Sequence, residues 1–315
     1  METCLLIHPE ELDLCWIEQL CQAGVTTLGL HPVGGKHADA SLRGMLGLFE
    51  EPAFQALLRK AEDRGLQITC EMHAMRYLLP EDTLRKHPQW MRVNRAGNRT
   101  TESNFCCSNP DALALAAENA ARLYRRLPGR PRRVAFWLDD AKDAFCHCEK
   151  CARLSPSDQQ MIILNAMLAG IRSVRRDAVL AYLAYYETLP APEQTQPQEG
   201  IYLEYAPYLR SMDRPIFDEA NAACNRSLPG LLQFFGTKDA TVLDYWYDNS
   251  WFSNYQKPPR ELRVDNAVVR ADMAYYRSLG FENISCFACY LGQDYRALYG
   301  LPDLSAFRLT PQCGG

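Results

Sequence analysis

Short apolar runs alternate with longer amphipathic stretches along the chain. The runs are rich in β-branched and aromatic residues and most are apolar nearly throughout, which is typical of parallel strands buried on both faces. Eight runs are predicted to be strands: residues 4–7, 25–31, 67–73, 133–139, 179–186, 200–205, 241–247 and 283–290. Because helix-length segments separate most of them, the pattern predicts an α/β fold, a single (β/α)8 TIM barrel spanning residues 1–315.

Six of the segments between the runs have the period of an amphipathic helix. They cover residues 12–23, 52–64, 110–127, 158–174, 217–235 and 264–279. Asn109 before Pro110 predicts an N-cap with proline at the first helical position. Ser157 with Gln160 predicts a capping box. Pro229 interrupts the fifth of these segments and predicts that this helix forms two pieces.

Two connections lack a helical pattern. The link over residues 188–199 is rich in Pro and Gln and has no apolar periodicity, so no full helix is expected there. The insertion over residues 79–105, after the third strand, contains an Arg-Ala-Gly-Asn turn sequence between short polar runs. It predicts a hairpin laid over the barrel mouth.

Composition and charge narrow the function classes. The chain is 47% hydrophobic and 23% charged, which is typical of a globular protein with a large core. A net charge of -4 and only short arginine runs argue against nucleic-acid binding. No stretch approaches the roughly 20 apolar residues of a membrane span, and the first residues do not resemble a signal peptide. We therefore expect a cytoplasmic protein with no membrane partner, and a homo-oligomer stays open.

The predicted strands end in carboxylates, histidines and aromatic residues. Active sites of (β/α)8 enzymes lie at the C-terminal ends of the strands, so these side chains are expected around one mouth. Aromatic faces cover the apolar faces of sugar rings and carboxylates bind hydroxyl groups, so the pattern indicates a small carbohydrate substrate. The predicted substrate-binding residues are His31, His73, Tyr186, Glu187, Trp246, Tyr247, Tyr290 and Asp294. The alternative is that the aromatic residues only pack at the rim.

Hydrolysis of a glycosidic bond needs two carboxyl groups, one protonated to assist the leaving oxygen and one ionised as base or nucleophile. Asp139 and Asp140 follow the fourth strand, and one of them is predicted to be the general acid. Glu204 on the sixth strand and Asp244 on the seventh are the predicted partners. For each acid the alternative is a salt bridge or a helix cap.

Three cysteines, Cys146, Cys148 and Cys151, lie within six residues of one another on a polar loop. A fourth thiol from Cys106 or Cys107 would complete the tetrahedral ligand set of a structural zinc ion. The alternatives are a set of reactive thiols and three loop cysteines without metal. Thirteen cysteines, an odd number, favour reduced thiols over a disulfide framework.

Two motifs in this region resemble known families. Cys106-x-Ser108-Asn109-Pro110, followed by a strand ending in Asp and then by Phe145-Cys146-x-Cys148-Glu149-Lys150-Cys151, resembles the bacterial family called domain of unknown function 4838. That family is grouped with glycoside hydrolase barrels, so the resemblance implies such a fold. The cysteines also resemble the structural zinc site of family 42 β-galactosidases. That resemblance implies Cys106, Cys146, Cys148 and Cys151 as ligands.

The retaining mechanism of those galactosidases does not carry over. They have Asn-Glu where this chain has Asp139-Asp140, and no clear glutamate nucleophile lies on the seventh strand. Adjacent aspartates after the fourth strand resemble instead enzymes that cleave N-acetylhexosaminides with help from the acetamido group of the substrate. The sequence-based hypothesis is a glycoside hydrolase that cleaves an oligosaccharide or glycoside by carboxylate chemistry.

Three other readings stay open. The barrel could bind sugar without cleaving it. A metal-dependent hydrolase would use His8, His31 and His73, which end three successive strands, as ligands. Arginines of the insertion, Arg92, Arg95 and Arg99, could clamp the carboxylate of an anionic sugar, unless they are simply solvated.

Overall fold

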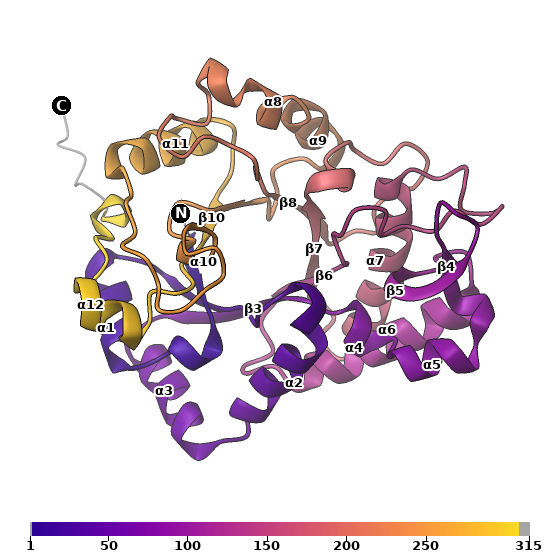
Figure 1. The fold of residues 1–315 in the computed structure, drawn as a ribbon, viewed down its shortest axis with the longest axis horizontal. Helices are drawn as coiled ribbons and strands as arrows, with labels where there is room; N and C mark the ends of the chain where they lie inside the picture. Colours follow the sequence, from indigo (N-terminus) through magenta and orange to yellow (C-terminus); the bar gives the residue numbers. More distant parts are fainter. Residues whose placement is uncertain (1, 309–315) are drawn as a thin grey trace.

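The computed structural model describes residues 2–308 and contains a closed barrel of eight parallel strands (Figure 1). The strands are β1 (Glu2–Ile7), β2 (Thr27–Leu30), β3 (Gln67–His73), β6 (Arg133–Trp137), β7 (Val179–Ala184), β8 (Ile201–Tyr205), β9 (Thr241–Asp244) and β10 (Asn283–Phe287). Each pairs with its neighbours along the chain, and β1 pairs with β10 to close the ring. The predicted (β/α)8 barrel is therefore confirmed, with shorter strands than the apolar runs in most cases.

The helices lie mostly around the outer side of the barrel, whereas the short helix Asn249–Phe252 lies over one end of it (Figure 1). They are α1 (Leu14–Ala23), α2 (Ala38–Leu48), α3 (Pro52–Asp63), α4 (Met75–Leu78), α5 (Glu81–Lys86), α6 (Pro110–Arg125), α7 (Pro156–Arg172), α8 (Ala222–Asn225), α9 (Leu228–Phe235), α10 (Asn249–Phe252), α11 (Asn266–Ser278) and α12 (Gln293–Tyr299). The segment interrupted by Pro229 does form two pieces, α8 and α9, with the proline in the first turn of α9. No helix within residues 2–308 is long and apolar enough to cross a bilayer.

The helix caps show where local sequence determines the boundaries. The Asn109 side chain accepts hydrogen bonds from the backbone N–H groups of Asp111 and Ala112, both at 3.1 Å, which confirms the predicted N-cap of α6. The capping box of α7 lies two residues before the predicted one. It pairs Ser155 with Asp158, because Pro156 takes the first helical position.

The insertion after β3 contains the predicted hairpin, formed by the antiparallel strands β4 (Met91–Val93) and β5 (Arg99–Phe105). Figure 1 shows it to one side of the barrel axis, beside α5 and α7. Val93 ties it to the loop after β6: its carbonyl accepts from the N–H of His147 at 2.7 Å, and its N–H lies 3.3 Å from Cys146 Sγ. The link between β7 and β8 contains only a 3-10 turn, Tyr186–Thr188, in agreement with the sequence.

Polar side chains occupy part of the barrel lumen. Because successive strand residues point alternately inward and outward, Glu71, Arg133, Trp137 and Glu204 all face the interior. The Trp137 indole N–H donates to Glu204 Oε2 at 2.5 Å, and the Glu204 and Glu71 carboxyl groups interact directly. One oxygen of each, Glu71 Oε2 and Glu204 Oε1, has no hydrogen-bond partner in the described structure. A proton held between the two groups would satisfy both.

This buried acid pair predicts a pH-dependent stability. Burial raises the pKa of Glu204 from 4.5 to about 7, so the folded state binds the proton more tightly than the unfolded chain does. The stabilisation is therefore complete below pH 4.5 and is lost as pH rises to about 7. The loss is roughly 3 kcal/mol.

Glu204→Gln is the matched variant, because its amide keeps an oxygen for Trp137 and offers an N–H to Glu71. Urea denaturation of both proteins at pH 5 and pH 7.5 should show that wild type loses more free energy of unfolding than Glu204→Gln between the two values. Equal losses would contradict the raised pKa.

Candidate active site

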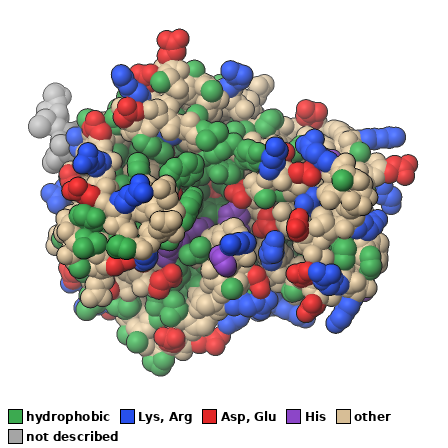
Figure 2. All heavy atoms as spheres, viewed as in Figure 1, with side chains coloured by type: hydrophobic (Ala, Val, Ile, Leu, Met, Phe, Trp, Pro, Cys, Tyr) green, Lys and Arg blue, Asp and Glu red, His purple; other side chains and the backbone are tan. Residues whose placement is uncertain are grey.

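A cavity of about 610 Å3 opens among the C-terminal ends of the strands. Figure 2 views this face, where histidine side chains lie in a central hollow beside a broad hydrophobic area. The polar lining includes His8, His31, His73, Asp140, Asp248 and Ser250, and the aromatic lining consists of Trp137, Tyr185, Tyr245, Trp251, Tyr255, Phe287 and Tyr290. The cavity is therefore a mixed surface of rings and hydrogen-bonding groups, at the position where barrel enzymes carry their chemistry.

Asp140 and Asp248 are the carboxylates that line this cavity. The Asp140 side chain is 40% exposed, and its Oδ2 lies 3.9 Å from His73 Nε2. Asp248 is the N-cap of α10, and its Oδ1 accepts from both the N–H (3.1 Å) and the Oγ (2.5 Å) of Ser250. Burial raises the pKa of Asp248 above its usual range. The two acids thus sit in different surroundings, as an acid and base pair requires.

Asp139 lies beside the cavity rather than in its lining. With Asp140, Tyr186 and Glu187 it lines a smaller adjacent crevice. Its backbone is held on both sides by Asn104 of β5, whose amide donates to the Asp139 carbonyl while its oxygen accepts from the Asp139 N–H, each at 2.9 Å. Burial raises the pKa of Asp139, and Arg76 lies 3.8 Å from its Oδ2.

The structure does not bring Glu204 and Asp244 to the cavity. Glu204 is fully buried in the lumen beneath Trp137. Asp244 points through the other side of β9, toward the outer helices, where its Oδ2 accepts from Arg210 Nη1 and from the Tyr276 hydroxyl, both at 2.8 Å. A carboxylate held in this way has a structural role, so the alternative reading of Asp244 as a salt-bridge partner fits it.

The predicted substrate-binding residues divide between the cavity and other places. His31, His73 and Tyr290 line the cavity, whereas Tyr186 and Glu187 line the crevice beside it. Trp246 and Tyr247 face away from the lumen: the Trp246 indole donates to Asp272, and the Tyr247 hydroxyl donates to Asn266. Asp294 pairs with Lys257 at 2.8 Å.

Several lining residues were missed because strand ends were read without regard to the side on which each side chain lies. Trp137 and Tyr245 are inward-facing by the alternation of β6 and β9, a signal that the sequence carries once the register is known. Trp251 and Tyr255 come from the loop after β9, which has no periodicity to place it. Tyr255 and Tyr290 have φ of 55° and 64°, left-handed values that cost about 1 kcal/mol or more in a residue with a Cβ and that cluster at functional sites.

The four cysteines predicted as metal ligands do come together. The Sγ atoms of Cys106, Cys146, Cys148 and Cys151 all lie within 4.8 Å of one another, and no other such group of His, Cys, Asp or Glu is found within residues 2–308. Cys106 Sγ is 3.7 Å from Cys148 Sγ and 3.8 Å from Cys151 Sγ. Four sulfurs at about 2.3 Å from one zinc ion would be about 3.8 Å apart, so the cluster fits a tetrahedral ion.

The neighbours of the cluster hold it in place. The Gln159 side chain accepts from the Cys146 N–H at 2.9 Å and donates to the Cys146 carbonyl at 3.0 Å, which fixes the loop that carries three of the thiols. Cys107, the alternative fourth ligand, lies outside the group of four, although its Sγ is 3.6 Å from that of Cys151. The geometry therefore selects Cys106, and a metal ion could be bound there.

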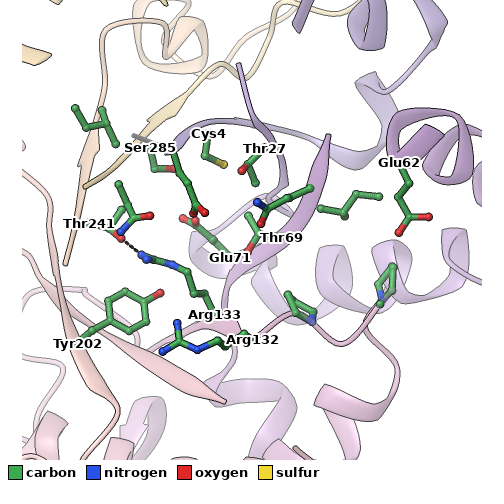
Figure 3. Close-up of a pocket in the computed structure, with 18 of the residues that line it drawn as sticks. Cys4, Thr27, Glu62, Thr69, Glu71, Arg132, Arg133, Tyr202, Thr241 and Ser285 are labelled. Atoms are coloured by element: carbon green, nitrogen blue, oxygen red, sulfur yellow. Dashed lines mark hydrogen bonds between the residues drawn. The ribbon is translucent and has the colours of Figure 1, made fainter. Parts of the chain in front are cut away.

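A second cavity, of about 390 Å3, opens at the opposite, N-terminal end of the barrel. Figure 3 shows Glu71, Arg133 and Tyr202 pointing into it, with Ser285 and Cys4 above them. Arg133 donates to Thr241 and stacks over the Tyr202 ring at 4.7 Å. Because this end of a barrel normally serves stability, we assign the cavity to the lumen core described above.

The fold is that of glycoside hydrolase barrels. A β-galactosidase from Rahnella sp. R3 is similar, with a TM-score of 0.56 and 14% identity, over 91% of this chain and 50% of that one. A GH42 β-galactosidase from G. stearothermophilus has a TM-score of 0.52 and 12% identity over 90% and 50%. A GH20 module of the pneumococcal exo-β-D-N-acetylglucosaminidase StrH has a TM-score of 0.52 and 9% identity over 97% and 83%. The chain thus spans about half the length of the two galactosidases.

Residues 42–246 match the family model described as domain of unknown function (DUF4838). The chain belongs to this family, as the cysteine and aspartate motifs indicated. No curated protein matches the chain.

Proposed function

We propose that the protein is a glycoside hydrolase whose active site is the cavity at the C-terminal ends of the strands. One observation carries the proposal: two carboxylates in different surroundings, Asp140 and Asp248, share a cavity lined by aromatic rings. Asp248 is buried and its pKa is raised, which suits a general acid that holds its proton. Its Oδ1 takes both bonds from Ser250, so Oδ2 is the oxygen that can carry the proton.

Asp140 takes the complementary role. It is the more exposed of the two acids, and we expect it to act as base or nucleophile, the role predicted from the sequence for Glu204 or Asp244. The general-acid role predicted for Asp139 or Asp140 passes to Asp248. The substrate proposed for this site is a small carbohydrate, because the rings of Trp137 and Tyr245 supply the flat apolar surfaces that a pyranose requires.

Conservative substitutions test these roles. A panel of aryl glycosides should identify a substrate, on which Asp140→Asn and Asp248→Asn should each lower kcat/KM by about 10²- to 10⁴-fold. Asn is as good an N-cap as Asp, so Asp248→Asn should keep the stability of α10 while losing activity. Asp143→Asn, in the same loop as Asp140 but outside the cavity lining, is the matched control and should retain activity.

The pH profile adds a second readout. Because the general acid must be protonated, activity should fall as pH rises through the raised pKa of Asp248, and Asp248→Asn should lose this alkaline limb.

Full activity in both aspartate variants would overturn the proposal. Sugar binding without turnover in wild type would favour the second candidate, a carbohydrate-binding barrel, in which Asp248 serves only as a helix cap.

We further propose that the four-cysteine cluster binds one zinc ion with a structural role. Four thiolates leave no open position for substrate, and when bound the ion would connect the end of β5 to the loop after β6. A reduced thiolate site suits a reducing compartment, which is the basis for proposing a cytoplasmic location.

A further inference from the structure

Three histidines of the cavity hydrogen-bond to the barrel wall in the same way. Nδ1 of His8 lies 2.8 Å from the carbonyl oxygen of His31, and Nδ1 of His31 lies 2.9 Å from that of Glu71. Nδ1 of His73 lies 2.8 Å from the carbonyl oxygen of Leu138. Each ring at the end of one strand therefore reaches the backbone of the next strand around the barrel.

This arrangement determines which nitrogen carries the hydrogen. A carbonyl oxygen only accepts, so each Nδ1 must donate, and the neutral ring then has an unprotonated Nε2. Burial lowers the pKa of His8 and lowers that of His31 to about 3, so both rings are neutral over the physiological range. All three histidines line the cavity, and with Nδ1 bonded to the barrel wall, Nε2 of His8 and of His31 is the ring nitrogen left to accept from a ligand.

The acidic side chains of the cavity lining, Asp140 and Asp248, outnumber its lysine, Lys36. Lys257, near the rim, is paired with Asp294 at 2.8 Å and lies over the Tyr290 ring at 5.0 Å. No arginine is part of the cavity lining in the described structure.

The arginines of the insertion are engaged elsewhere. Arg92 Nε donates to the carbonyl of Glu102, Arg95 pairs with Asp143 at 3.0 Å, and Arg99 donates to the carbonyl of Met91. The suggestion that they clamp an anionic sugar in this cavity is therefore not supported.

We propose that the cavity selects ligands rich in hydrogen-bond donors and without an anionic group, that is, neutral or basic sugars, and discriminates against acidic sugars. The inference deepens the proposed function and rests on it for the position of the site. Sugar hydroxyls would donate to Nε2 of His8 and His31, and a ring or substituent amine would pair with Asp140. A uronate would place its negative charge near the Asp140 carboxylate, without a guanidinium to receive it.

The tautomers can be tested without a substrate. In protein labelled with ¹⁵N-histidine, long-range ¹H–¹⁵N correlation spectra at pH 7.5 distinguish Nδ1–H, Nε2–H and doubly protonated rings. Six histidines give a small spectrum, which His8→Gln, His31→Gln and His73→Gln would assign one by one. We expect the Nδ1–H form for His8 and His31. An Nε2–H or doubly protonated ring at His8 or His31 would overturn the inference, because Nε2 would then donate a hydrogen bond to the ligand instead of accepting one.

Ligand selectivity is tested by calorimetry with three probes: a piperidine iminosugar, the neutral sugar and its uronic acid. The three probes share one configuration in each set, and one set is gluco and the other galacto. The iminosugar should bind at least 10-fold more tightly than the neutral sugar, and the uronate at least 10-fold more weakly. His31→Leu should weaken the neutral sugar about 10-fold, whereas His87→Gln, at a ring that stacks on Trp90 at 4.0 Å outside the cavity lining, should not.

The outcomes separate the two proposals. A uronate that binds as tightly as the neutral sugar overturns the selectivity even if Asp140→Asn abolishes turnover. If the three probes bind in the expected order of affinity but no glycoside is turned over, the result supports the selectivity and overturns the proposed hydrolase function. Failure of all three probes to bind at millimolar concentration overturns the selectivity.

Discussion

A chain that carries Cys148→Ser is expected to lose its one equivalent of bound zinc and at least about 3 kcal/mol of its free energy of unfolding. A structural zinc site contributes on the order of 10 kcal/mol to folding, and three remaining thiols hold the ion far less well than four. Metal content by mass spectrometry and urea denaturation measure the two effects. Wild type should bind one zinc ion per chain.

The damage should be concentrated at the hairpin. Cys106 follows directly after β5, and Cys146, Cys148 and Cys151 lie in the loop after β6, so a bound ion would join two segments that are far apart in the sequence. Without it, the hairpin is held to the loop by the contacts of Val93, the two hydrogen bonds of Asn104 with Asp139 and the Arg95–Asp143 pair. Limited proteolysis should then cut within residues 91–105 of Cys148→Ser while the barrel core stays resistant.

Cys107→Ala is the control, because Cys107 is adjacent in sequence to Cys106 and about as buried, but lies outside the group of four. It should keep the metal. Zinc retained by Cys148→Ser, or lost equally from Cys107→Ala, would contradict the assigned ligand set. Chelation of wild type should reproduce the proteolysis pattern of Cys148→Ser, and added zinc should reverse it.

The barrel was predictable because each strand packs against the barrel interior on one side and against the surrounding helices on the other. Most strand residues are therefore apolar, and eight apolar runs stand out in the sequence. The cysteine cluster was predictable because three of its members are neighbours in sequence and the fourth lies in a recognisable motif. The hairpin was predictable from its turn residues, but its position beside the mouth depends on tertiary contacts such as that between Val93 and His147.

The candidate site was only partly predictable. Strand ends were recognised, but a strand end offers two directions, and a shift of one residue exchanges them. Asp244, the last residue of β9, and Trp246 just after the strand both point outward, whereas Tyr245 between them faces the cavity. Asp248 directly follows the predicted seventh strand, but only the conformation of the loop after β9 places it in the cavity.

Arg210→Met should lower the free energy of unfolding by about 3 to 5 kcal/mol, because it leaves two carboxylates buried without their cation. Arg210 lies 2.8 Å from Asp244 Oδ2 and 2.7 Å from Asp272 Oδ2, and the side chains of Arg210 and Asp244 are wholly buried. Asp272 also accepts from the Trp246 indole, and its pKa is raised above its usual range by burial. The network thus ties β9 to α11 and to the loop after β8.

A triple variant distinguishes the cost of an uncompensated charge from the cost of lost packing. If the cost arises from the unpaired carboxylates, Arg210→Met combined with Asp244→Asn and Asp272→Asn should recover much of the lost stability, since the remaining groups are neutral and can still hydrogen-bond. If the cost arises from packing, the added substitutions should destabilise further. Arg126→Met, which breaks the exposed pair with Glu50, is the control and should cost less than about 1 kcal/mol. A loss at Arg210 no larger than at Arg126 would mean that Asp244 is not held by this pair, and its exclusion from the catalytic set would lose its physical basis.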